Sequence, residues 1–264
     1  MIRGRAPLDD VLASPASKAR YVRRLFSTIA DRYDLITVLL SFGLDRGWKR
    51  RVLDLAAPRP GQRALDLACG TGDITFGLGA RGALVVGLDI THRMLELARL
   101  RAASGGDPAR QAGTRVAPGG APARQARTPH SAFVTADMCA LPFADGEFDV
   151  VTTGYGLRNV PDIDAAIREI LRVLQPGGVL VSLDFNRPSN VVVRAVYLGY
   201  LRIVGGALGW ALHRDPDTYR YIPASIARYP GAASVASRMT SAGFERAEWQ
   251  AVLGGLMAIH VARK

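Results

Sequence analysis

Cysteine is nearly absent from this chain of 264 residues. Its two copies, Cys69 and Cys139, are too few for a disulfide framework or for the four ligands of a structural zinc site. We therefore expect no metal centre and a reducing compartment, for which the cytoplasm is the default.

Long uncharged apolar runs are also missing. A spanning helix needs about 20 predominantly apolar residues, and the best candidate, residues 191–213, is interrupted by Arg194 and Arg202. The N-terminus carries Asp9 and Asp10 where a secretory signal would need an apolar segment. These features argue against a spanning helix and against secretion.

Acidic residues are scarce relative to basic ones, since 23 Asp and Glu against 34 Lys and Arg give a formal net charge of +11. Some of this charge lies in residues 101–130, where arginines are spread through Ala, Gly and Pro without aromatics. Single-strand nucleic-acid binders interleave aromatics for base stacking. We therefore interpret residues 102–130 as a low-complexity insertion and predict no nucleic-acid partner.

Short apolar runs alternate with helix-like stretches over much of the chain. The runs predict strands at residues 63–68, 83–89, 131–137, 148–153 and 178–185, and an amphipathic helix at 163–174. Near-continuous apolar strands in a β-α-β rhythm indicate a parallel sheet covered by helices on both faces. The C-terminal part predicts a helix and two further strands, which form an antiparallel hairpin at one edge.

The sequence thus predicts an α/β fold with a Rossmann-like, seven-stranded, mostly parallel sheet and an antiparallel C-terminal hairpin. We expect a flexible tail over residues 1–20 and a single domain over residues 21–264. No internal repeat divides the chain further.

A glycine turn follows the first predicted strand, in "LDLACGTGD" at residues 65–73. Gly70 and Gly72 permit positive φ and a close approach of backbone to a ligand. The Gly-Lys-Ser/Thr of a P-loop is missing, and Thr75 stands where a dinucleotide fingerprint has its third glycine. Asp73 would repel a pyrophosphate, so the turn favours a nucleoside with a cationic or zwitterionic tail.

Acidic residues recur where the strands of this region end. Asp89 closes the second strand, where a carboxylate can accept both ribose hydroxyls. Asp137 closes the third, where it can accept from an adenine amine with Met138 against the ring. Together with Asp66 in the first strand, these residues predict a nucleoside site, although a lone Asp at a strand end is usually a turn or cap residue.

Several motifs resemble the S-adenosylmethionine-dependent class I methyltransferases, among them "LDLACGTGD", "GLDI", "LPFADGEFDVVT" and "LRVLQPGG". More narrowly, "YDLITVLLSFGLDRGWK", "GYGLRNVPD", "YRYIPASIARYP" and "GGLMAIHVARK" resemble the ubiquinone/menaquinone biosynthesis C-methyltransferase family. The resemblance implies S-adenosylmethionine as cofactor, with contacts from Thr71, Asp89, Asp137, Met138 and Tyr33. The chain departs from the family at Thr37, Cys69 and Gly154; the last removes a side-chain contact to the cofactor.

Arg158 and Asn159 lie side by side just past the fourth strand, and the resemblance implicates this pair in catalysis. A quinol ring carbon becomes a nucleophile once a neighbouring hydroxyl has lost its proton. Because arginine side chains stay protonated in proteins, we expect Arg158 to stabilise the phenolate, with Asn159 orienting the ring oxygen. The alternative interpretation is structural: Arg158 caps the following helix or pairs with Asp162 or Asp164.

Two other side chains are weaker candidates for the chemistry. His260 is a tempting general base, but it falls in a strand-like segment near the chain end, where a packed histidine is at least as common. Asp184 follows the fifth strand and is a candidate for the rim of the active site.

The resemblance implies C-methylation of a polyprenylated quinol, and we favour demethylmenaquinol as the substrate over the benzoquinol of ubiquinone biosynthesis. A substrate-covering segment is expected at about residues 187–230. We also expect the protein to be cytoplasmic and to associate transiently with the inner face of the membrane. The alternatives are a nucleic-acid methyltransferase, a non-catalytic cofactor-binding protein, and an enzyme for another small phenolic or lipid. Tail length and oligomeric state, including a homodimer, are left open.

Overall fold

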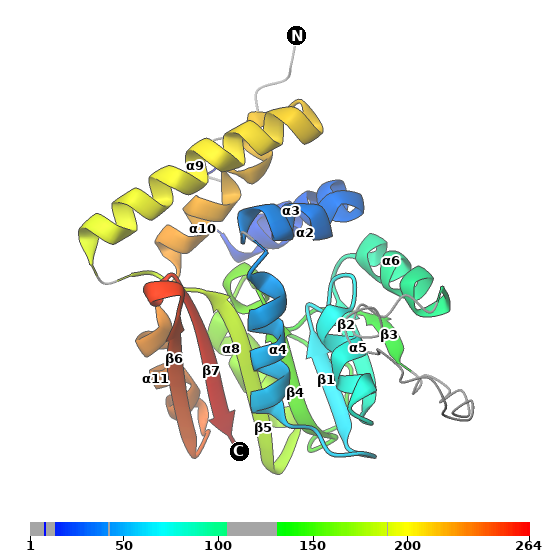
Figure 1. The fold of residues 1–264 in the computed structure, drawn as a ribbon. Helices are drawn as coiled ribbons and strands as arrows, with labels where there is room; N and C mark the ends of the chain where they lie inside the picture. Colours follow the sequence, from blue (N-terminus) through cyan, green and yellow to red (C-terminus); the bar gives the residue numbers. More distant parts are fainter. Residues whose placement is uncertain (1–7, 9–13, 42, 105–130, 189) are drawn as a thin grey trace, which may run out of the picture.

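The computed structural model describes residue 8 and residues 14–41, 43–104, 131–188 and 190–264 (Figure 1). Most of the predicted insertion and of the predicted tail lie outside the described residues. The strands are β1 (Arg63–Leu67), β2 (Leu84–Asp89), β3 (Ala132–Thr135), β4 (Phe148–Gly154), β5 (Leu174–Phe185), β6 (Arg246–Val252) and β7 (Met257–Arg263).

These strands form one seven-stranded sheet in the order β3-β2-β1-β4-β5-β7-β6. The first five in this order pair in parallel, whereas β7 is antiparallel to both β5 and β6. The predicted fold class and C-terminal hairpin are therefore confirmed. Strand β5 begins at Leu174, four residues earlier than predicted. Its register with β4 shifts between Phe148 and Val150, so the residues QPGG lie within the strand.

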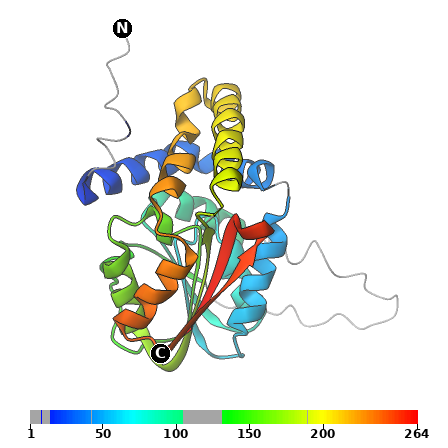
Figure 2. The ribbon, with the colours of Figure 1, turned by 90° about the vertical axis from the view of Figure 1, so that its left-hand side faces the viewer.

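Helices cover both faces of the sheet and its carboxyl end (Figure 2). They are α2 (Pro15–Ile29), α3 (Tyr33–Leu40), α4 (Asp45–Ala56), α5 (Asp73–Ala80), α6 (His92–Ala103), α8 (Ile163–Val173), α9 (Val191–His213), α10 (Tyr221–Arg228) and α11 (Ala232–Ala242). Short 3-10 helices are η1 (Ala30–Arg32), η2 (Leu157–Asn159), η3 (Pro216–Tyr219) and η4 (Leu253–Gly255).

Two hydrophobic clusters sandwich the sheet. On one face, α8 and α11 bury Ile167, Ile170 and Met239 against strand residues such as Leu65 and Leu180. On the other face, α4 and α5 pack against alternate residues of the same strands, such as Ala64, Val150 and Val181. Side chains buried on both faces account for the near-continuous apolar strands of the sequence.

A third cluster lies above the carboxyl ends of the strands, where α2, α3, α9 and α10 form a cap (Figures 1 and 2). Its buried members are Ile29, Ile36 and Tyr219. The chain runs outward from β1 to β3 and then returns to β4, so the strand order reverses between β1 and β4. A ligand site is expected at this reversal, beneath the cap.

Helix α2 begins inside the predicted tail. The Ser14 side chain caps it by accepting from the amide of Ser17 at 3.2 Å. Lys18 reaches the loop that follows β4 and donates to the carbonyl oxygens of Arg158 at 3.1 Å and Val160 at 2.6 Å. The boundary predicted at residue 21 therefore falls too late, because residues 15–20 belong to a helix that is tied to the folded domain.

Two glycines give opposite expectations for stability. Gly243 ends α11 with a φ of 115°, where alanine would be strained by about 1 kcal/mol. Gly47 lies in α4 with no atom within 4 Å of the position of an added Cβ. We expect Gly243→Ala to lower the free energy of unfolding by about 1 kcal/mol, and Gly47→Ala to raise it by about 0.5 kcal/mol. Urea unfolding measures both, and shifts of the same sign would contradict the assigned backbone conformations.

Candidate active site

Two small cavities lie around the glycine turn at the reversal of strand order, with volumes of about 80 Å³ and 20 Å³. We call them the glycine-turn cavities. Both are lined by Tyr33, Ala68, Gly70, Gly154 and Tyr155. The ends of β1 and β4 and the first residue of α3 therefore enclose this region together.

The structure brings nearly all the predicted nucleoside-site residues to these cavities. The larger cavity is lined by Tyr33, Gly70, Asp89, Asp137 and Met138, and the smaller one by Tyr33, Asp66, Gly70 and Thr71. Gly72 lines neither cavity. With a φ of 93° it instead starts α5, where an added Cβ would lie 2.7 Å from the Phe76 ring.

Asp89 joins the glycine turn to the end of β2. Its carboxylate accepts from the amide of Gly70 at 3.0 Å and from the amide of Thr91 at 2.8 Å. Burial raises the pKa of this carboxyl group, although both amide hydrogen bonds oppose the shift. Each oxygen keeps a second lone pair, so the carboxylate can still accept from a ligand hydroxyl.

Asp137 and Met138 also line the larger cavity. The Asp137 carboxylate accepts from the amide of Cys139 at 2.8 Å, which fixes its orientation, and the Met138 side chain is buried beside it. A carboxylate next to an apolar surface suits a flat, amine-bearing ring.

Thr91 is a lining residue that the sequence analysis missed. It is almost fully buried, lines the larger cavity, and its hydroxyl has no hydrogen-bond partner. An unsatisfied buried hydroxyl costs about 1–3 kcal/mol. A polar ligand atom in this cavity would remove that cost, so the cavity fits a ligand with hydroxyl or amine groups.

Asp66 is buried at the wall of the smaller cavity. It accepts from the hydroxyls of Thr75 at 2.7 Å and Thr152 at 2.9 Å. Burial raises the pKa of Asp66 to about 6, and the two hydroxyl hydrogen bonds limit the shift. A cationic ligand group would favour the ionised form of this carboxyl.

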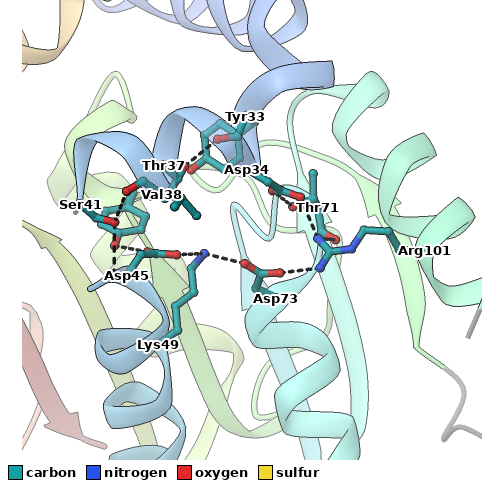
Figure 3. A network of polar contacts seen from close by, with 11 residues as sticks. Tyr33, Asp34, Thr37, Val38, Ser41, Asp45, Lys49, Thr71, Asp73 and Arg101 are labelled. Carbon is teal, nitrogen blue, oxygen red and sulfur yellow. Dashed lines mark hydrogen bonds and ion pairs between the residues drawn. The ribbon is translucent and has the colours of Figure 1, made fainter. Parts of the chain in front are cut away.

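A chain of alternating charges links the glycine turn to α3, α4 and α6 (Figure 3). Lys49 on α4 lies 2.7 Å from both Asp45 and Asp73, and Arg101 on α6 lies 2.8 Å from Asp73 and 3.3 Å from Asp34. The hydroxyl of Thr71 then donates to Asp34 at 2.7 Å. Four segments distant in sequence are thereby held together.

This chain of charges corrects the interpretation of Asp73. Burial alone would raise the pKa of its carboxyl, but Lys49 and Arg101 hold the pKa below the usual value. The carboxylate is ionised, yet its charge is balanced by two cations of the protein. Repulsion of a pyrophosphate by a free Asp73 is therefore wrong as an argument, because Lys49 and Arg101 both pair with this carboxylate.

A separate apolar cavity of about 530 Å³ lies under the cap. Leucine, isoleucine, valine, phenylalanine and tyrosine side chains from α2, α3, α9 and α10 dominate its wall. Among the described residues that line it, Arg158 is the only one with a charged side chain. Tyr33, Tyr155 and Asn159 line both this cavity and the glycine-turn cavities, so they form the boundary between the two spaces.

Arg158 is buried and held by the neighbouring strand. Its guanidinium lies 3.3 Å from Asp184 at the end of β5, donates to the hydroxyl of Ser225, and stands 4.8 Å from the Phe185 ring centroid. Asp184 also accepts from the backbone amide of Arg158 at 2.9 Å. The alternative that Arg158 pairs with Asp162 or Asp164 is wrong, since Asp162 caps α8 and Asp164 pairs with Arg238.

Asn159 is oriented by two hydrogen bonds. Its amide nitrogen donates to the carbonyl oxygen of Tyr155 at 2.8 Å, and its amide oxygen accepts from the hydroxyl of Tyr221 at 3.0 Å. One N–H and one lone pair remain for a ligand. The predicted pair therefore lies at the boundary of the two spaces, with Arg158 toward the apolar cavity.

Tyr155 holds a strained conformation at this boundary. Its φ of 61° is uncommon for a residue other than glycine, and such strain is concentrated at functional sites. The hydroxyl donates to Asp45 at 2.5 Å, and burial raises the pKa of Tyr155 well above its usual value. Tyr155 thus acts as a donor that fixes the wall, and not as a base.

His260 does not belong to the site. It lies in β7, is buried, and its Nε2 donates to the carbonyl oxygen of Ala232 at 2.9 Å. Burial lowers the pKa of this histidine, so it is neutral. The packed interpretation is the one that the structure supports, whereas Asp184 lies behind Arg158 and not at an exposed rim.

Comparison with known proteins finds relatives that match nearly the whole chain. Residues 15–264 match the model of the ubiE/COQ5 methyltransferase family. The chain is 38% identical over 249 residues to the ubiquinone/menaquinone biosynthesis C-methyltransferase UbiE of Azotobacter vinelandii, covering 93% of this chain and 90% of that protein. It is 36% identical over 247 residues to the protein of the same name from Shewanella frigidimarina, covering 92% and 90%.

Solved structures share the fold at lower sequence identity. Magnesium protoporphyrin IX methyltransferase from Synechocystis, solved with bound SAH, is 19% identical with a TM-score of 0.58, and the match covers 94% of this chain and 99% of that one. A methyltransferase from Aquifex aeolicus matches with a TM-score of 0.53 and 14% identity over 81% and 88% of the two chains. These likenesses concern the fold.

The raised pKa of Asp66 predicts a pH-dependent stability. Between about pH 4 and pH 6 the folded state holds a proton that the unfolded chain releases, so this contribution is complete below about pH 4 and is lost as pH rises through about 6. We expect the unfolding free energy of the wild type, relative to that of Asp66→Asn, to fall by roughly 2 kcal/mol from pH 4 to pH 8. Urea unfolding of both proteins measures this, and a pH-independent difference would contradict the assigned pKa.

Proposed function

This chain belongs to the ubiE/COQ5 methyltransferase family, and from that premise we propose that it methylates a ring carbon of a polyprenylated quinol with S-adenosylmethionine as the donor. The substrate that we propose first is demethylmenaquinol, and the benzoquinol of ubiquinone biosynthesis is second. The observation that carries the proposal is the contact of a 530 Å³ apolar cavity with the glycine-turn cavities at Asn159 and Tyr155. The fused-ring quinol is the more apolar substrate, which fits a wall with a single charged side chain.

The glycine-turn cavities have the groups that S-adenosylmethionine requires. We assign the ribose hydroxyls to Asp89 and the adenine to Asp137 and Met138, with Thr91 as a further polar contact. The amino-acid end is assigned to Asp66, Gly70, Thr71 and Tyr33. When bound, the cofactor supplies an electrophilic methyl group on a sulfonium.

Arg158 is assigned to the charge that develops on the quinol. Among the described residues, the wall of the apolar cavity contains no carboxylate, imidazole or amine that would act as a base. A fixed guanidinium in a poorly solvated cavity stabilises a phenolate far more than one in water. Arg158 therefore lowers the pKa of the quinol hydroxyl, while Asp184 and Ser225 keep its guanidinium in place.

Asn159 and its partners are assigned to positioning. Hydrogen bonds to Tyr155 and Tyr221 fix the amide of Asn159 at the junction of the two spaces, where it can orient a ring oxygen. The cap that supplies the apolar wall includes the segment expected to cover the substrate, through Val192, Val196 and Tyr197 of α9. Exclusion of water by this wall strengthens the electrostatic effect of Arg158.

The decisive experiment offers methyl-labelled S-adenosylmethionine and each reduced quinone to the purified protein. We expect label in demethylmenaquinol, with a smaller rate for the benzoquinol. Label in the benzoquinol alone would reverse our choice of ring. Cofactor binding without label in either lipid would overturn the proposal and favour another small phenolic or a non-catalytic role.

Variants of the Arg158–Asp184 pair test the assigned role of the guanidinium. Arg158→Ala alone would leave a buried carboxylate unpaired, which costs about 3–5 kcal/mol, so we pair it with Asp184→Asn. We expect the double variant to lose about 100-fold or more in kcat, with S-adenosylmethionine affinity within a few-fold of the wild type.

Arg158→Lys serves as the matched variant, because it keeps the charge and loses the planar fork. Its kcat should lie between those of the wild type and the double variant. A defect confined to cofactor affinity, measured by calorimetry, would show that Arg158 acts on the cofactor and not on the quinol.

A further inference from the structure

Helix α9 turns its apolar side outward. Val192, Val196, Ile203 and Trp210 are 70%, 68%, 75% and 70% exposed. They recur every four or seven residues, so they lie along one side of the helix. We call these four residues the outer stripe. Surface helices of water-soluble proteins normally place such a stripe toward the core.

The inner side of α9 is occupied by protein. Leu201, Gly205 and Gly209 are buried, and a Cβ added to Gly205 would lie 3.2 Å from the Cβ of Tyr219. Among the described helices, α9 alone has the length and hydropathy of a membrane span, yet only 17% of its most apolar window is buried. A helix packed on one side and exposed on the other suits the plane of a membrane interface and not a span surrounded by lipid.

The outer stripe is continuous with the apolar cavity. Val192 and Val196 belong both to the stripe and to the cavity wall. Val193 and Leu253, which are also exposed, line the cavity without belonging to the stripe. A cavity of about 530 Å³ holds a ligand of drug size. A ring with a long polyprenyl tail exceeds it, so the tail must leave the cavity along an apolar path.

Positive charge accompanies this apolar surface. Helices α2 and α9 contain no Asp or Glu, and four of their arginines are exposed, namely Arg20, Arg23, Arg24 and Arg202. Both helices lie in the cap, at the end of the molecule opposite the amino ends of the strands (Figures 1 and 2). Exposed cations near an apolar surface favour an anionic lipid headgroup layer, which attracts each Lys or Arg by about 1 kcal/mol.

We propose that the outer stripe of α9 docks in the interface of an anionic lipid bilayer. The valines at the mouth of the cavity then meet the hydrocarbon, so a quinol enters ring first while its tail stays in the lipid. The role of this docking in catalysis rests on the proposed quinol substrate. The docking itself does not, because it follows from the stripe and the charge.

The test compares two double variants of the full chain for binding to vesicles of phosphatidylcholine with phosphatidylglycerol. Ile203→Ser/Trp210→Ser changes two residues of the stripe that line no described cavity. Leu84→Ser/Trp249→Ser removes a similar pair, 52% and 41% exposed, on β2 and on the edge strand β6. We expect the first variant to bind at least tenfold more weakly than the wild type, and the second to bind like it.

Two further readouts separate this proposal from the proposed function. The stripe variant should keep wild-type turnover on a quinol with a short, water-soluble tail, and lose it on a long-tailed quinol held in vesicles. Vesicle docking without methylation of any quinol would leave the docking intact and refute the proposed substrate. Methylation of the long-tailed quinol at equal rates by both variants would refute the docking.

Three results would overturn the docking outright. The first is equal vesicle binding by the stripe variant and the wild type. The second is a dimer in sedimentation velocity that the stripe variant dissociates, with no vesicle binding, because a second copy would then cover the stripe. The third is a protein that only detergent, and not alkaline carbonate, releases from membranes, because α9 would then span the bilayer.

Discussion

The buried pair of Arg158 and Asp184 is the interaction on which the site depends. An apolar cavity can hold a cation only if a carboxylate compensates it, and Asp184 lies at the end of the neighbouring strand β5 to do so. Because the same carboxylate accepts from the backbone amide of Arg158, it also holds η2 in place. Lys18 binds two carbonyl oxygens of this loop from the other side, so α2, β4 and β5 meet at one point.

The two ligand spaces share a wall, and that wall is built from constrained residues. Tyr155 stands in a left-handed backbone conformation and is tied to Asp45, while Asn159 is tied to Tyr155 and Tyr221. The Tyr155–Asp45 contact joins the residue after β4 to α4, and the Asn159–Tyr221 contact joins η2 to α10 of the cap. A wall so constrained fixes where a ligand in one space would meet a ligand in the other, and such positioning is how proximity lowers a barrier.

Much of the site was predictable because its residues stand at strand ends, where local pattern and position coincide. Asp89, Asp137 and Asn159 all follow apolar runs, and the parallel sheet brings such ends to one edge. Lys49, Asp45 and Arg101 gave no such signal. A charged residue on a helix is usually solvated, and the contacts of Lys49 and Arg101 with Asp73 and of Asp45 with Tyr155 join residues far apart in the sequence. Thr91 was hidden for another reason, since a hydroxyl becomes buried without a partner only through tertiary packing.

The sequence by itself determined the strand and helix pattern, the glycine turn and the family, because apolar periodicity and short motifs are local properties of the chain. Only the tertiary structure decided that Asp73 is balanced by Lys49 and Arg101, that Arg158 pairs with Asp184, and that residues 15–20 belong to the domain. It also decided which side of α9 faces outward. A helical stripe has the same period whether it points to the core or to the solvent, and only packing against Tyr219 and its neighbours distinguishes the two.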